Sequence, residues 1–150
     1  MANTYTSLRY HIVFSTKERR PLIAADIEQR VWEYLGGIAR QNGMQPLQVG
    51  GIEDHIHIVV SIPPTMAVSK AVQQIKGGSS KWIHETFLDL NDFAWQDGYG
   101  AFSVSRSQLS TVINYAATQR EHHRERNFQD EYRSILERHE IEYDERYVWG

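Results

Sequence analysis

A chain of 150 residues, 41% hydrophobic and 11% aromatic, is long enough for one compact domain, and we expect a single domain over 1–150. The chain has no cysteine, which excludes a disulfide-stapled fold, and no run approaches the ~20 apolar residues of a membrane span, so we expect a cytoplasmic protein that does not enter the membrane. Residues 1–120 carry eleven Lys or Arg against ten Asp or Glu, whereas residues 121–150 carry five against nine, a balance that neither predicts nor excludes a nucleic-acid site.

The first half of the chain predicts a strand, a helix and a hairpin. Residues 5–15 (YTSLRYHIVFS) combine aromatic and β-branched side chains, as strands do, and a basic loop over 16–21 follows. Apolar residues at helical spacing predict a helix over about 26–41. Residues 45–49 and 55–62 then predict the two strands of a hairpin.

The second half predicts two long helices with a short strand between them, and then a last helix. The helices cover residues 68–87 and about 106–123, the strand covers 101–105, and the last helix covers about 128–138. The order strand, helix, strand, strand, helix, strand, helix predicts an α+β fold, a mainly antiparallel sheet with helices packed on it. This order also fits a ferredoxin-like or RNA-recognition-like core with added C-terminal helices.

Two histidines stand one residue apart in the stretch DHIHIVV, at the start of a predicted strand. Side chains at positions i and i+2 of a strand point to the same face, so His55 and His57 would lie side by side. Two imidazoles on one face can bind one cation, and Glu53 and Asp54 lie close enough to orient a ring. A strand with one exposed and one hydrogen-bonded histidine has the same pattern, so H-x-H alone leaves both interpretations open.

A tyrosine and a glutamine lie four residues apart in the third predicted helix, within INYAATQREHH. Tyr115 and Gln119 are therefore neighbours on one helical face, on the shoulder of the apolar stripe. A tyrosine in this position can pack its ring while its hydroxyl reaches a site on the sheet. The alternative is an ordinary boundary tyrosine beside a solvated glutamine.

Several fragments together resemble one known family. They are YHIVFSTKERRP, EDHIHIVVSIPP, QQIKGGSSKWI, WQDGYGAFSVSRSQLSTVINYAATQREHH and DEYRSILERHEIEYDERYVW, and they extend over about residues 5–149. The chain resembles the HUH endonucleases, named for His-hydrophobic-His, and within them the single-strand tyrosine transposases of insertion sequences. The spacing of Tyr-x-x-x-Gln after H-x-H makes this resemblance specific.

The resemblance implies an enzyme that cleaves and rejoins single-stranded DNA at the hairpin-marked ends of a mobile element. Tyr115 would be the nucleophile and would form a 5′-phosphotyrosine intermediate. His55, His57 and the side-chain oxygen of Gln119 would hold a divalent cation, Mg²⁺ or Mn²⁺, with positions left open for phosphate oxygens. Relatives act as homodimers, in which the tyrosine helix of one subunit can complete the metal site of the other.

Basic and hydroxyl side chains in the first loop and the second helix are candidate contacts to DNA phosphates. A solvated surface is the alternative for each cluster. The candidates are Lys17, Arg19, Arg20, Lys76, Ser79, Ser80 and Lys81.

The histidines outside H-x-H are interpreted as structural or surface residues. We expect His11 in the core or on the sheet surface, and His84 and His139 at the surface. His122 and His123 end the third predicted helix, where a cation suits the helix dipole, and we expect them to be capping or solvated. The family resemblance leaves a minor role near DNA open for them.

Two other functions fit the same residues. One is a host-recruited relative that processes repeated palindromes in a genome. The other is a non-catalytic nucleic-acid-binding domain that uses the sheet as a platform, with structural histidines.

Overall fold

The structure is a computed structural model that describes residues 3–124 and 126–150. It contains four strands, which pair antiparallel in the order β2-β3-β1-β4, so the predicted α+β fold with a ferredoxin-like strand order is confirmed. The strands are β1 (Arg9–Ser15), β2 (Gln45–Ile52), β3 (His55–Ser61) and β4 (Gly100–Ser103), and the helices are α1 (Glu28–Gln41), α2 (Val68–Thr86), α3 (Leu109–Ala117), α4 (Gln119–His122) and α5 (Phe128–Arg138). Within the described ranges, no helix is both long and apolar enough to cross a membrane.

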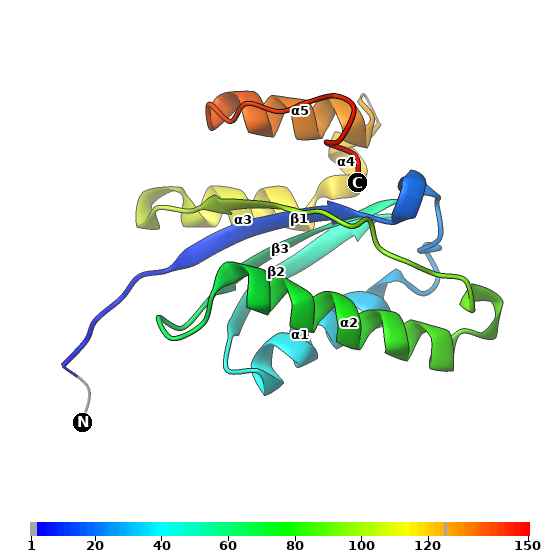
Figure 1. Ribbon diagram of the computed structural model, residues 1–150, viewed down its shortest axis with the longest axis horizontal. Coiled ribbons are helices and arrows are strands. Elements are labelled where there is room, and N and C mark those ends of the chain that lie inside the picture. Colours follow the sequence, from blue (N-terminus) through cyan, green and yellow to red (C-terminus); the bar gives the residue numbers. More distant parts are fainter. Residues whose placement is uncertain (1–2, 125) are drawn as a thin grey trace.

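Helices cover both faces of the sheet. Helices α1 and α2 lie on one side, and α3, α4 and α5 lie on the other (Figure 1). Alternate residues of β1 face opposite sides, so Ile12 and Phe14 join the large core under α1 and α2, whereas Val13 packs with Phe102 and the apolar side of α5. The sheet therefore has no open face of the kind that an RNA-recognition-like platform needs.

Several strand boundaries differ from those predicted: β3 ends at Ser61 rather than at residue 62, and β4 covers Gly100–Ser103 rather than 101–105. Strand β1 begins at Arg9 rather than at Tyr5, because its partner β3 ends at Ser61. Only Ile62, which still donates to the Leu8 carbonyl, separates Ser61 from two prolines that cannot donate ladder hydrogen bonds. Strand β2 continues to Ile52, which pairs with His55 in a tight hairpin. The last helix has the predicted bounds.

The third predicted helix is interrupted, so the prediction of one helix over 106–123 is wrong. Helix α3 ends at Ala117, and Thr118, with φ −111° and ψ 33°, separates it from α4. The carbonyl of Tyr115 accepts a hydrogen bond of 3.0 Å from the side-chain amide of Gln119. This side-chain contact to the backbone competes with helix continuation, and the turn buries Gln119.

Helix α3 crosses β2 in close contact at one glycine. A Cβ at Gly50 would overlap the backbone carbonyl oxygen of Ala116, so only glycine allows the helix to lie at this distance. Gly50 pairs with His57 across the hairpin. The close crossing therefore sets the distance between the helix that carries Tyr115 and the strand that carries the histidines.

We predict that Gly50→Ala lowers the free energy of unfolding by about 3 kcal/mol, because α3 must move away from β2. The control is Gly37→Ala in α1, where an added Cβ meets nothing within 4 Å. This control should be neutral or stabilising by up to about 1 kcal/mol, because alanine favours a helix interior. Urea denaturation of both variants measures the difference, and equal stability would contradict the proposed close crossing.

Candidate active site

His55 and His57 lie side by side on the face of β3 that α3, α4 and α5 cover. Both side chains are fully buried. The Nδ1 atom of His55 lies 2.7 Å from the Asp54 carboxylate, as expected for an acidic residue that orients the ring. The two rings meet edge to face with centroids 5.0 Å apart.

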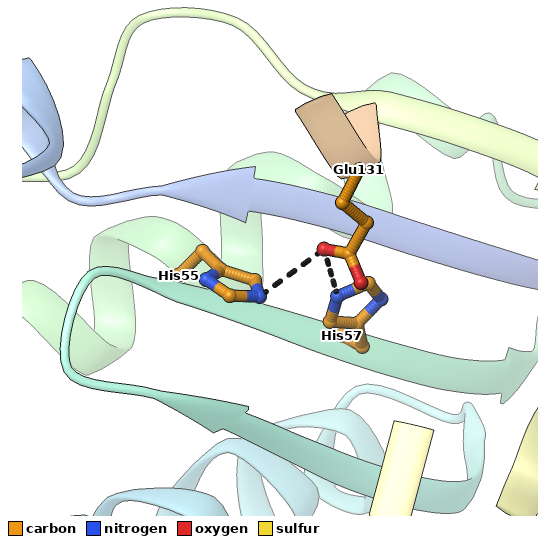
Figure 2. A group of neighbouring side chains, drawn as sticks. All are labelled: His55, His57 and Glu131. Atoms are coloured by element: carbon orange, nitrogen blue, oxygen red, sulfur yellow. Dashed lines mark hydrogen bonds and ion pairs between the residues drawn. The ribbon is translucent and has the colours of Figure 1, made fainter. Parts of the chain in front are cut away.

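A carboxylate from α5 lies between the two histidines. Glu131 Oε1 is 3.3 Å from His55 Nε2 and 3.1 Å from His57 Nε2 (Figure 2). These three side chains are buried, and one potential ligand atom from each lies within 4.8 Å of the others. The group can therefore hold a metal ion.

The sequence contains a signal for Glu131 that H-x-H and Tyr-x-x-x-Gln do not. The apolar stripe of α5 consists of Phe128, Tyr132, Ile135 and Leu136, all of them buried. Glu131 stands on this stripe at helical spacing. A carboxylate is rarely buried without a partner, so an acidic residue on an apolar stripe indicates a polar site beneath it.

Gln119 and His123 complete the polar cluster. The Gln119 side-chain oxygen lies 3.0 Å from His55 Nε2 and 3.1 Å from His123 Nε2. The same His123 nitrogen is 3.1 Å from Glu131 Oε1, and the side chain of His123 is 4% exposed. His123 is the C-cap residue of α4, in agreement with the capping expectation, but its side chain is buried rather than solvated, because the break between α3 and α4 turns the chain toward the sheet.

His11 supports His57 from the neighbouring strand. His11 Nε2 lies 2.7 Å from His57 Nδ1, and the two rings are stacked with centroids 5.0 Å apart. His11 is buried, within the expectation for this residue. A ring held through its second nitrogen keeps its orientation and tautomer, so His11 orients His57.

The hydroxyl of Tyr115 donates a hydrogen bond to Glu131 Oε2. The tyrosine ring lies 5.6 Å from that of His57, and the guanidinium of Arg126 is 3.4 Å from the hydroxyl. Burial, together with the negative charge and hydrogen bond of Glu131, raises the pKa of Tyr115 to about 12, despite the opposing effect of Arg126. The phenol is therefore protonated in the metal-free site.

The negative charge of Glu131 lies beside a protonated His55 and a neutral His57. Burial lowers the pKa of His55, but the hydrogen bonds and charges of Asp54 and Glu131 outweigh burial and raise it to about 9. Burial holds the pKa of His57 at about 4, so His57 is neutral. Burial favours protonation of Glu131, but hydrogen bonds from the histidines hold its pKa well below the usual range.

The donor set suits a divalent cation. Two imidazole nitrogens, one carboxylate oxygen and one amide oxygen converge from His55, His57, Glu131 and Gln119. Mixed nitrogen and oxygen donors of this kind suit Mn²⁺ and related ions, and His55 has to release its proton when it becomes a ligand. The structure brings together the predicted ligands His55, His57 and Gln119. Glu131 adds a negatively charged ligand, which the predicted set does not contain.

Most of the predicted phosphate contacts on α2 are not placed for that role. Ser79 is buried and donates to the Ile75 carbonyl at 2.6 Å, and the Lys76 ammonium donates to the carbonyls of Gln96 and Gly98 at 2.7 and 2.6 Å. Both predictions are wrong, because these groups are used inside the fold. Ser80 and Lys81 belong to the same helix, α2, which lies on the opposite side of the sheet from α3, α4 and α5 (Figure 1).

The basic loop after β1 does lie beside the strand that carries the histidines. The backbone of Thr16 donates to the Asp54 carbonyl at 2.9 Å, next to His55. Lys17 is exposed, Arg19 packs on the Trp149 ring at 5.3 Å, and Arg20 pairs with Asp92 at 3.3 Å. A DNA contact from this loop stays a prediction.

The other histidines outside the cluster have different environments. His84 is half-buried and hydrogen-bonded to the Phe93 carbonyl at 2.6 Å, so the prediction of a surface residue is wrong. His139 is exposed, as predicted, and stacks on Phe102. His122 is exposed, with its ring 4.6 Å from that of Tyr115.

Comparison with known proteins gives one family. The family described as "Transposase IS200 like" matches residues 4–119. A transposase for insertion sequence element IS200 from Salmonella typhimurium is 32% identical over an alignment of 112 residues, and the match covers 71% of this chain and 74% of the relative. The ISDra2 transposase TnpA of Deinococcus radiodurans is 24% identical over an alignment of 117 residues, and the match covers 75% of this chain and 84% of the relative.

Two solved structures share the fold. A structure assigned as a transposase from Deinococcus radiodurans R1 matches with a TM-score of 0.67 and 22% identity, and the match covers 77% of this chain and 92% of the other. A REP-associated tyrosine transposase bound to a REP hairpin matches with a TM-score of 0.55 and 13% identity, over 77% of this chain and 70% of the other. At these identities the likeness shows the fold alone.

We predict that the metal-free protein loses stability as the pH falls from 6.5 to 5, partly through His11. Burial lowers the pKa of His11 to about 3, so the unfolded chain, with a histidine pKa of 6.5, takes up a proton that the folded chain does not. The stability from this difference is complete above pH 6.5 and decreases as the pH falls, by about 1 kcal/mol per pH unit.

The measurement is urea denaturation in EDTA at pH 6.5, 6 and 5, compared with His11→Asn. The asparagine variant should show a shallower decrease, whereas the control His139→Asn, at an exposed position, should follow the parent chain. The same slope in all three proteins would show that His11 is not held neutral.

Proposed function

This chain belongs to the IS200-like transposase family, and on that premise we propose that it cleaves and rejoins single-stranded DNA with Tyr115 as the nucleophile. The observation that carries the proposal is the contact between Tyr115 and Glu131, because the same carboxylate also lies between His55 and His57. The candidate nucleophile and the two histidines of the candidate metal site therefore contact the same carboxylate, Glu131.

The chemistry balances without an added energy source. The Tyr115 oxygen attacks the scissile phosphorus, a 5′-phosphotyrosine bond forms, and the bond to the 3′ oxygen breaks. The phenol loses one proton, and the leaving 3′ oxygen takes up one proton and becomes a hydroxyl, so no net proton is released. Attack by the 3′-hydroxyl of another strand on the phosphotyrosine reverses the step, which rejoins DNA and restores the tyrosine.

The side chains around Tyr115 position its oxygen and its proton. Glu131 holds the hydroxyl by accepting its hydrogen bond, and Arg126 places a positive charge at 3.4 Å. That charge lowers the pKa of the phenol and thus favours loss of the proton. His11 fixes the ring of His57, so that its Nε2 stays directed at Glu131.

We assign the metal site to His55, His57 and Glu131, with the Gln119 oxygen as a further ligand. A bound Mg²⁺ or Mn²⁺ would polarise the scissile phosphate and neutralise the charge that develops on it. This ligand set has a carboxylate in addition to the two histidines and the glutamine that the family resemblance implies.

The proposed substrate is single-stranded DNA marked by hairpins, and the proposed assembly is a homodimer. The hairpin is supported by the REP-associated relative, whose structure contains a REP hairpin. Within one chain, Tyr115 already lies beside its own His57, so the site has its nucleophile without a residue from a second subunit. The covered sheet disfavours the alternative of a non-catalytic domain that binds nucleic acid on its strands (Figure 1).

We predict that Tyr115→Phe abolishes covalent adduct formation, because phenylalanine packs like tyrosine but has no nucleophilic oxygen. The assay incubates end-labelled single strands from both sides of the source gene with the protein and Mn²⁺, followed by a denaturing protein gel. Binding of the same strands should stay within about twofold of the parent chain. An adduct that persists in this variant would exclude Tyr115 as the nucleophile.

We predict that Glu131→Gln weakens Mn²⁺ binding at least tenfold, because the site loses its charged ligand. The matched control is Glu137→Gln, which removes an exposed carboxylate from the same helix. Calorimetric titration with Mn²⁺ measures both affinities, and circular dichroism shows that each variant is folded. Unchanged Mn²⁺ binding in folded Glu131→Gln would exclude Glu131 as a ligand.

A further inference from the structure

Two adjoining cavities lie between α3 and α5. Their volumes are about 340 and 190 Å³, and a small-molecule site typically occupies about 300–1,000 Å³. Strands β1 and β4 contribute His11 and Phe102 to the larger cavity. The residues common to both cavities are His11, Gln108, Val112, Arg138 and His139. We call the two together the α3–α5 cleft.

The α3–α5 cleft leads to the candidate nucleophile. His55, His57 and Glu131 have no exposed surface, so a phosphate cannot approach them directly from solvent. Tyr115 is only half-buried, and it lines the smaller of the two cavities together with Thr111 and Ile135. A strand that lies in the cleft would therefore contact the Tyr115 side chain.

The lining of the cleft suits a nucleotide chain. No carboxylate is among the residues that line either cavity, although residues 121–150 carry nine acidic residues. The Arg138 guanidinium provides a cation for a phosphate, and Gln108 and Thr111 provide neutral donors. The His139 ring stacks on Phe102 at 4.7 Å, which gives an aromatic surface for a base.

We propose that the α3–α5 cleft binds the single-stranded DNA next to the scissile phosphate, with a backbone phosphate on Arg138 and a base against His139. The inference rests on the proposed function and adds a binding site to it. One wall of the cleft is α5 (Phe128–Arg138), which lies beyond the residues 4–119 that the family matches. The C-terminal helix thus supplies both Glu131 and a substrate contact.

The absence of cysteine allows a direct test by blocking the cleft. Thr111→Cys, inside the cleft, and Ser110→Cys, exposed on the same helix but outside both cavities, are each labelled with pyrene maleimide. The probes are the single strands from both sides of the source gene, tested for binding by fluorescence anisotropy and for adducts with Mn²⁺. The label at position 111 should reduce strand affinity and adduct yield at least tenfold each. The label at position 110 should change each quantity less than twofold.

Arg138→Gln gives a second test without a bulky group. We expect strand binding to weaken about tenfold, because a charge-assisted contact to phosphate is lost. The control is Arg133→Gln on the same helix, whose guanidinium pairs with Glu145 and does not line the cleft. Thermal unfolding shows whether each variant is folded, and Mn²⁺ titration should be unchanged in both.

The outcomes separate the two proposals. If the labelled Thr111→Cys and the Arg138→Gln variants bind and cleave like the parent chain, the cleft is not the site, and the proposed function stands. If the parent chain binds strands without forming an adduct, the proposed function fails, and the binding data still decide on the cleft. If the parent chain neither binds nor cleaves any strand, both proposals are overturned.

Discussion

The buried carboxylate of Glu131 is the interaction on which the site depends. It contacts His55, His57 and His123 and accepts the hydrogen bond of Tyr115, so one side chain ties β3 to α3, to α5 and to the turn after α4. A buried charge is tolerated only when it is paired and hydrogen-bonded, and here the protonated His55 provides the opposite charge. Because the contacts of Glu131 join several elements, the carboxylate fixes the positions of the helices on this side of the sheet relative to β3.

The same carboxylate connects the two halves of the proposed chemistry. Glu131 is the charged member of the candidate metal-binding group, and it also accepts the hydrogen bond of the Tyr115 hydroxyl. In the metal-free chain burial raises the pKa of Tyr115, and the negative charge of Glu131 raises it further, which keeps the phenol in its unreactive form. A cation bound to Glu131 would compensate that charge, so metal binding and activation of the nucleophile are expected to be linked through this residue.

The α3–α5 cleft extends the role of the C-terminal helix. One end of α5 begins with Phe128, which stacks on His55 at 4.5 Å, and the other end places Arg138 in the wall of the cleft. The apolar residues between these two ends pack on β1 and β4, which holds the helix in place across the sheet. Helix α5 therefore covers the buried histidines and also borders the cavity that Tyr115 lines, where Arg138 gives an acidic C-terminal segment a basic edge.

The sequence by itself determined most of the elements and the pair of motifs. Aromatic and β-branched residues predicted the first strand, apolar residues at helical spacing predicted helices, and the i, i+2 rule placed His55 and His57 on one face, because these features depend on local periodicity. Tertiary structure alone decided the rest. Gln119 reaches His55 because the helix breaks at Thr118, and Glu131 reaches both histidines because α5 folds back across the sheet. Such contacts join residues far apart in the chain, and their free energy comes from packing and charge pairing that no local pattern contains.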